Sequence, residues 1–155
     1  MVKTDRNFWH VISIHAPRAP RNSLPGAKLV LYVSFDDAEN PTEDGSWALA
    51  RESDIQSIFE FADEHPTAPL LVHCRAGVSR SAAIALTFIV RGLLHSENLV
   101  EDAAEQLLNI RPHARPNVHV LRLGLRQFLP APRAEELTVA LVNHPTLFNN
   151  RFLPQ

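Results

Sequence analysis

The feature that most restricts the fold is the segment from residue 70 to residue 94, where a short apolar run, a loop of small and basic residues and a long apolar stretch follow one another. Leu70–Val72 is typical of a buried strand. The stretch from Ser81 to Leu94 is apolar on nearly every side, which predicts a buried helix. The loop HCRAGVSR at residues 73–80 therefore lies at a strand-to-helix turn.

The pattern elsewhere in the chain predicts two more strands and four more helices. Apolar runs at Val11–Ile14 and Leu29–Phe35 are bounded by turn residues, as strands are. The capping-box pattern Ser53 to Gln56 predicts a helix that ends near His65. Apolar residues at helical spacing predict helices at 99–110, 118–128 and 134–142, followed by a polar tail. Three strands followed by several helices indicate an α/β fold, a three-layer sandwich with a mostly parallel sheet flanked by helices.

Length and composition limit the class of partner. A chain of 155 residues suits a single domain over residues 1–155. The net charge of −2 leaves no global basic field for a nucleic-acid backbone. The longest apolar run, Ala82–Val90, is far shorter than the roughly 18 residues of a membrane span, and the first residues show no secretory signal. A single cysteine, Cys74, suits a reducing compartment. We therefore expect a cytoplasmic protein that binds neither nucleic acid nor a membrane.

The loop carries two groups that suit phosphate chemistry. A strand-to-helix turn directs backbone N–H groups and the positive end of a helix dipole into one concavity, which suits a phosphate-like dianion. A thiolate at Cys74 would be stabilised by the same groups. Arg80, six residues further on, could reach back and hold two oxygens of the anion. A nucleophile and an anion clamp would then share one loop.

This loop resembles the signature of the cysteine-dependent protein tyrosine phosphatases, which is His-Cys, five residues, Arg, then Ser or Thr. It is most similar to compact dual-specificity members and their small bacterial relatives, from about Phe8 to Phe128. The resemblance implies that Cys74 is the nucleophile, that Arg80 binds phosphate, and that Ser81 eases departure of the thiolate. It implies also that His73 supports the loop. The substrate phosphate would be bound by the residues of the loop, which are Arg75, Ala76, Gly77, Val78, Ser79 and Arg80.

Three other interpretations of the loop stay open. Cys74 could be a buried core thiol and Arg80 an ordinary residue of a helix N-terminus, although the motif and its predicted context coincide. A rhodanese-like sulfurtransferase also has a cysteine in an anion-binding loop, but the ending Ser79 to Ser81 favours a phosphatase. A phosphate-binding module without turnover is the third, and retention of both Cys74 and Arg80 counts against it.

Dephosphorylation of tyrosine needs a general acid, because the reference pKa of about 10 makes phenolate a poor leaving group at pH 7. The resemblance favours Asp37, with Asp36 second, both after a strand expected to run beside the nucleophile strand. Trp47, in the same loop, could cover the cleft or pack beneath the loop. The other acids of the loop are expected to be solvated surface residues: Glu39, Glu43 and Asp44.

No metal or cofactor is expected. The histidines show no spacing typical of a zinc site. A basic run in the second half could flank the substrate or form a solvated helix face: Arg111, His113, Arg115, Arg122 and Arg126. Pro116-Asn117 is similar to a Pro-Asn segment that buttresses the site in members of the family that the loop resembles.

The function predicted from the sequence is hydrolysis of phosphotyrosine in proteins, with phosphoserine and phosphothreonine as further substrates, through a cysteinyl-phosphate intermediate. The expected partner is a phosphorylated protein. Phosphoinositides and RNA 5′-phosphates are the alternative substrates, and protein substrates are favoured because only Arg75 adds charge inside the loop.

Overall fold

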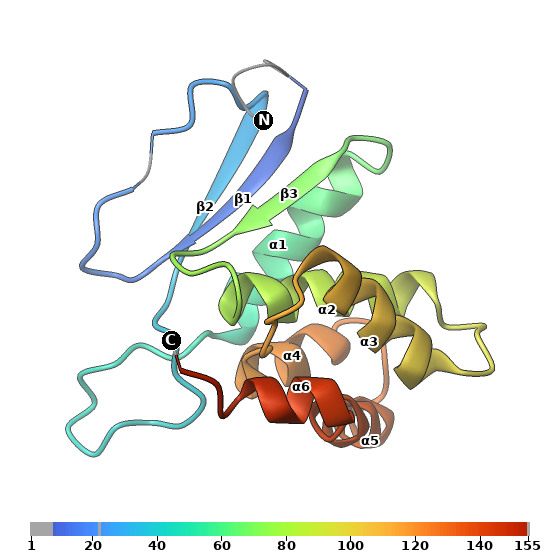
Figure 1. The fold of residues 1–155 in the computed structure, drawn as a ribbon. Helices are drawn as coiled ribbons and strands as arrows, with labels where there is room; N and C mark the ends of the chain where they lie inside the picture. The colour runs from blue at the N-terminus through green and yellow to red at the C-terminus, as the bar shows by residue number, and fades with distance from the viewer. Residues whose placement is uncertain (1–7, 22, 155) are drawn as a thin grey trace.

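The computed structural model describes residues 8–21 and 23–154, which form a three-stranded sheet and six helices (Figure 1). The strands are β1 (His10–His15), β2 (Leu29–Ser34) and β3 (Leu70–His73). All pairings are parallel, and the order across the sheet is β2-β1-β3. The carboxyl ends of the three strands therefore lie at one edge of the sheet.

The strand order corrects one expectation from the sequence. The strand that precedes the acidic loop, β2, was expected beside the nucleophile strand β3, and this was wrong because β1 lies between them. The burial of each strand gives the reason. Every residue from His10 to Ile14 is buried, which suits a central strand, whereas Leu29 at the start of β2 is exposed and suits an edge.

The helices lie close to where the sequence pattern predicts them. They are α1 (Glu52–Glu64), α2 (Arg80–Gly92), α3 (Leu99–Ile110), α4 (Val118–Leu125), α5 (Ala131–Val142) and α6 (Pro145–Asn150). Helix α1 begins slightly before the expected capping box, because the Asp54 carboxylate accepts the backbone N–H of Arg51 at 2.8 Å.

The polar tail expected after residue 142 was wrong, since α6 occupies this part of the chain. Pro145 stands at the first turn of α6, where its missing N–H costs nothing, and Leu147 is buried in the core. A short amphipathic turn of this kind shows too few apolar residues for a periodic pattern to reveal it.

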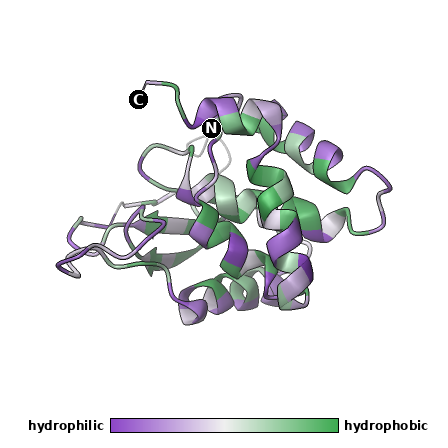
Figure 2. Cartoon of the chain, turned by 90° about the horizontal axis from the view of Figure 1, so that it is seen from below, coloured by the Kyte–Doolittle hydropathy of each residue, from purple (hydrophilic) through white to green (hydrophobic). Residues whose placement is uncertain are grey.

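The core forms where the helices meet the sheet. Helix α1 packs on β2 and α2 on β3, while α3 and α4 lie along α2. Gly124 of α4 faces Thr87 of α2 so closely that a Cβ atom there would lie 2.8 Å from the Thr87 methyl carbon. In Figure 2 the segments in the middle of the molecule are mostly green, and purple residues predominate in the loops beyond the sheet. The expected fold class, a parallel sheet flanked by helices, is confirmed.

Candidate active site

The candidate site lies at the carboxyl edge of the sheet, where the loop from Cys74 to Ser79 joins β3 to α2. Because β2 ends at the same edge, the loop that follows it, residues 35–51, reaches the same region (Figure 1). Catalytic and ligand-binding residues of parallel sheets typically lie at this edge.

The Cys74 thiol is buried beside the start of α2. Only 8% of the residue is exposed, and its Sγ lies 3.2 Å from Oγ of Ser81. Burial raises the pKa of this thiol. Hydrogen bonds from the Ser81 hydroxyl and from the backbone N–H groups of Ser81 and Gly77, with the charge of Arg80, outweigh burial and leave the pKa below its ordinary value. The loop therefore favours a thiolate.

Gly77 gives the loop the shape that these hydrogen bonds require. Its φ of +71° lies in the left-handed region, which a residue with a Cβ atom adopts only with strain. The guanidinium of Arg111 lies just above it, at 3.7 Å from the position a Cβ would take. Glycine at this place therefore allows the backbone to turn its N–H toward the thiol.

Arg80 is the buried cation of the site. The residue is 7% exposed, and its Nη1 donates a hydrogen bond of 2.9 Å to the carbonyl of Phe35, at the end of β2. Its Nε is buried and has no partner among the described residues. An unpaired buried N–H on a charged group is costly, so the guanidinium is suited to an anion that would bind beside Cys74.

Asp37 touches the rim of the loop, and Asp36 does not. Asp37 Oδ1 accepts hydrogen bonds from Ser79 Oγ at 2.7 Å and from Asn117 Nδ2 at 2.8 Å. Asp36 instead accepts the backbone N–H of Ala48 at 2.7 Å and fixes the two ends of its own loop. Asp37 therefore lies at the rim of the loop, while Asp36 is bound within its own loop.

Glu39 corrects another expectation. It was expected to be a solvated surface residue, and this was wrong, because it is partly buried and forms a two-pronged ion pair with Arg151 at 3.0 and 2.8 Å. Its Oε1 also accepts the backbone N–H of Val118 at 3.2 Å, at the start of α4. The other two acids of the loop, Glu43 and Asp44, are exposed as expected.

Two solved structures are similar to this chain in fold. One is Tk-PTP, a protein tyrosine phosphatase in its active form, with a TM-score of 0.54 and 19% identity over 83% of this chain and 84% of that chain. The chain has the protein tyrosine phosphatase fold. The second is a mouse protein described as a dual specificity phosphatase, in complex with zinc tungstate, with a TM-score of 0.52 and 21% identity over 88% of this chain and 77% of that one. No protein-family model matches the chain.

Within this phosphatase fold, the remaining loop residues take different positions. Arg75 and Ala76 are exposed, Gly77, Val78 and Ser79 are half-buried, and Arg80 is buried. His73 ends β3, and burial lowers its pKa, while a backbone hydrogen bond at Cys74 acts in the opposite direction. Its Nε2 is buried without a partner among the described residues. Burial of His73 therefore favours the neutral form of its imidazole.

Three residues near the site, Asn117, Glu39 and Arg151, form contacts that could not be predicted from the sequence. Asn117 binds both Asp37 and the carbonyl of Ala38, and caps α4 through its Oδ1. The resemblance of Pro116-Asn117 to a buttressing segment was the only signal for it. The pair of Glu39 and Arg151 had no signal, since the two residues are far apart in the chain and neither belongs to a motif.

The basic run divides between two places. His113 and Arg115 line a pocket of about 450 Å³ together with loop residues Ala76 and Val78. The backbone N–H of Arg115 also donates to the carbonyl of Val78 at 2.8 Å. By contrast, Arg122 forms an ion pair with Glu135 of α5. The first part of the run therefore flanks the loop, and the second belongs to the helix surface.

Trp47 lies in the loop that carries Asp36 and Asp37. It is 52% exposed, which does not suit a residue packed beneath the loop. Its backbone N–H donates to Oγ1 of Thr42, within the same loop.

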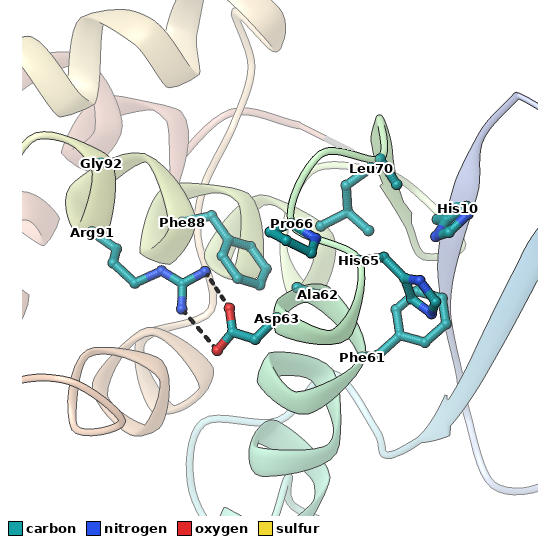
Figure 3. Close-up of a pocket in the computed structure, with 11 residues that line it drawn as sticks. His10, Phe61, Ala62, Asp63, His65, Pro66, Leu70, Phe88, Arg91 and Gly92 are labelled. Atoms are coloured by element: carbon teal, nitrogen blue, oxygen red, sulfur yellow. Dashed lines mark hydrogen bonds and ion pairs between the residues drawn. The ribbon is translucent and has the colours of Figure 1, made fainter.

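Another pocket, of about 430 Å³, lies at the amino ends of β1 and β3 (Figure 3). Its walls include His10, Phe61, Leu70 and Phe88, with the ion pair of Asp63 and Arg91 to one side. It contains no residue of the candidate active site, because the amino ends of β1 and β3 lie at the edge of the sheet opposite the Cys74 loop.

Over the described ranges 8–21 and 23–154, no cluster of three or more His, Cys, Asp or Glu side chains could hold a metal ion. In the same ranges no helix is both long enough and apolar enough to cross a membrane.

Proposed function

We propose that this chain is a phosphomonoesterase that hydrolyses phosphotyrosine in proteins, with phosphoserine and phosphothreonine as further substrates. One observation carries the proposal. The thiol of Cys74, with a lowered pKa, shares a loop with the buried guanidinium of Arg80, whose Nε has no partner in the described residues. A thiolate and a dianion held by the same N–H groups are what nucleophilic displacement at phosphorus requires.

In the first step the thiolate of Cys74 attacks phosphorus, so the S–P bond forms and the bond from phosphorus to the ester oxygen breaks. Arg80 and the backbone N–H groups of the loop stabilise the charge on the equatorial oxygens. Protonated Asp37 donates its proton to the departing oxygen, which leaves as an alcohol or a phenol. Ser79 and Asn117 hold Asp37 at the rim of the loop for this transfer.

In the second step water attacks phosphorus of the cysteinyl phosphate. Asp37, now ionised, takes a proton from the water, and the S–P bond breaks to release inorganic phosphate. The hydroxyl of Ser81, 3.2 Å from Sγ, donates to the sulfur as negative charge returns to it. The cycle consumes one water and returns Cys74 to the thiolate and Asp37 to the acid.

The position of the basic run also supports a second candidate class of substrate, beside phosphorylated proteins. The sequence argument for protein substrates was that only Arg75 adds charge inside the loop. The structure adds Arg111 above Gly77, and His113 and Arg115 beside Ala76 and Val78. These groups suit a substrate with more than one phosphate, such as a phosphoinositide or an RNA 5′-phosphate.

The test is release of inorganic phosphate from p-nitrophenyl phosphate, followed by a panel of phosphotyrosine, phosphoserine and phosphothreonine peptides, a phosphoinositide and a 5′-phosphorylated RNA. Arg80→Lys is the variant of choice, because lysine keeps the charge but loses the forked donors. We expect turnover by the wild-type protein and a loss of at least about 10²-fold in Arg80→Lys. Phosphate binding without turnover would instead identify a binding module.

The proposal includes a single catalytic domain over residues 1–155 and action without a metal or cofactor, because Arg80 and the loop dipoles supply the positive charge. It also includes a cytoplasmic place of action, supported by the single cysteine, whose reactivity needs a reducing environment.

A further inference from the structure

We infer that Arg151, at the end of α6, is a positioning residue for the general acid: it holds the segment from Asp37 to Glu39 in the place from which Asp37 reaches the leaving group. The inference rests on the proposed function, because it gives a task to a residue outside the loop. Arg151 lies beyond the helix that the sequence did not predict, and it touches no residue from Cys74 to Ser81 through a hydrogen bond among those described.

The acidic segment from Asp37 to Glu39 docks on the N-terminus of α4. Asn117, which caps α4, donates from Nδ2 both to Oδ1 of Asp37 at 2.8 Å and to the carbonyl of Ala38 at 3.2 Å. The next residue, Val118, donates its backbone N–H to Glu39 at 3.2 Å. Three consecutive residues thus lie against one helix N-terminus, whose dipole favours the carboxylate of Glu39.

Arg151 binds the carboxylate of Glu39 on the side opposite α4. Arg151 donates from Nη1 to Oε1 at 3.0 Å and from Nη2 to Oε2 at 2.8 Å, which is a two-pronged contact. The side chains of Arg151 and Glu39 are 29% and 31% exposed, so solvent screens the pair less than an ion pair at the surface. Glu39 is therefore held from two directions, two residues away from Asp37.

The helix that precedes Arg151, α6, is anchored to the rest of the molecule. Leu147 of α6 is 1% exposed in the core, and Asn150 donates from Nδ2 to the carbonyls of Pro112 and Ala114 at 3.0 and 2.8 Å. These carbonyls belong to the segment that leads from α3 into α4. In Figure 1 the end of the chain lies beside the loop that follows β2, as this contact requires.

The consequence is specific to proton donation. A side chain that reaches a leaving group from a loop acts only while that loop is in place, and geometry errors of about 1 Å can cost roughly 10²-fold in rate. Without Arg151, Glu39 keeps only the N–H of Val118, and the segment gains freedom. Attack by Cys74 does not depend on this segment, so formation of the cysteinyl phosphate should slow only for substrates whose leaving group needs a proton.

The experiment compares phenyl phosphate, whose leaving group needs a proton, with p-nitrophenyl phosphate, whose leaving group needs one much less. For Arg151→Met we expect kcat/KM, which reports formation of the cysteinyl phosphate, to fall for phenyl phosphate by about 3- to 10-fold more than for p-nitrophenyl phosphate, a part of the roughly 10²- to 10⁴-fold that general acids supply. Breakdown of the cysteinyl phosphate is common to both substrates, so it does not enter this comparison. Arg151→Lys should restore part of the difference, because it keeps the charge without the fork.

Glu39→Gln is the second variant, because it keeps an oxygen for Val118 but removes the charge, and it serves if Arg151→Met does not fold. The double variant should lose no more than the worse single variant. Arg133→Met is the matched control, since Arg133 pairs with Glu136 on the exposed side of α5, and its ratio of the two rates should equal that of the wild type.

The outcomes separate the two claims. If the wild-type protein releases no phosphate from p-nitrophenyl phosphate, the proposed function fails. If the wild type is active but Arg151→Met and Glu39→Gln lower kcat/KM for both substrates equally, or for neither, then Arg151 has only a structural role and the inference is overturned.

Discussion

Sγ of Cys74 and Oγ of Ser81 lie 3.2 Å apart, with the sulfur at the end of the strand and the hydroxyl in the first turn of the helix that follows. The hydroxyl acts on the same sulfur at two stages of the proposed reaction. It lowers the pKa of the thiol before attack, and it stabilises the thiolate when the cysteinyl phosphate breaks down. This short contact makes the charge of Cys74 the property most open to test.

Ser81→Ala should raise the pKa of Cys74, because it removes the hydroxyl that opposes the effect of burial. The rate of alkylation by iodoacetamide follows the thiolate fraction, so its midpoint should move to higher pH. Breakdown of the intermediate should also slow, which would appear as a burst of phenol release. Ser57→Ala, an exposed serine of α1, is the control and should leave the midpoint in place. An unchanged midpoint in Ser81→Ala would show that the hydroxyl does not stabilise the thiolate.

Cys74→Ser should abolish turnover and keep binding of phosphate or vanadate. A serine hydroxyl is not ionised by this loop, whereas the backbone N–H groups and Arg80 remain. Binding can be followed by the rise in melting temperature with added vanadate. Residual turnover within about tenfold of the wild type would contradict the assignment of Cys74 as the nucleophile, since loss of a covalent nucleophile costs far more than that.

Asp37→Asn should lower kcat/KM, which reports formation of the cysteinyl phosphate, by about 10²- to 10⁴-fold for a phosphotyrosine peptide and much less for p-nitrophenyl phosphate. Asp36→Asn is the matched control, because an amide oxygen can still accept the N–H of Ala48. If Asp36→Asn shows the leaving-group effect and Asp37→Asn does not, the acid is Asp36.

Addition of EDTA should leave the rate on p-nitrophenyl phosphate unchanged. In the proposed mechanism the guanidinium of Arg80 and the N–H groups of the loop stabilise the equatorial oxygens, as a metal ion does in metal-dependent phosphatases. The measurement is initial rate after dialysis against the chelator, with and without added Mg²⁺ or Zn²⁺. Recovery of activity only after a metal is returned would contradict this prediction.

Hydrogen peroxide should inactivate the protein, because a thiolate of lowered pKa is oxidised readily to sulfenic acid. Since the chain has a single cysteine, no internal disulfide can trap that product. Recovery therefore depends on an added thiol such as dithiothreitol, and bound vanadate should protect. Mass spectrometry should find the oxidation on Cys74, and an inactive protein with Cys74 unmodified would refute the prediction.

The sequence alone was sufficient for the parts of the molecule that depend on neighbours in the chain. The strand, loop and helix around Cys74 follow from hydrophobic pattern and turn residues, and the loop presents Cys74, Gly77 and Arg80 in one short segment. A helix start such as the one after Asn98 is likewise a local event. These features are readable because their causes lie within a few residues of one another.

Only the tertiary structure shows which of the two adjacent carboxylates, Asp36 or Asp37, touches the rim of the Cys74 loop. Adjacent side chains after a strand point in different directions, and a one-residue change in register exchanges them. The partners that distinguish them are distant in sequence, since Ser79 and Asn117 bind Asp37, while Ala48 binds Asp36.

Contacts between residues distant in the sequence also explain why the expected strand order and the expected exposure of Glu39 were wrong. The place of β1 between β2 and β3 depends on which strand can be buried on both faces. The ion pair of Glu39 with Arg151 joins residues from the first and last thirds of the chain, at a site that exists only after α6 has packed against the core. Local pattern determined the strand-to-helix loop that carries Cys74, and long-range packing determined which residues stand opposite that loop.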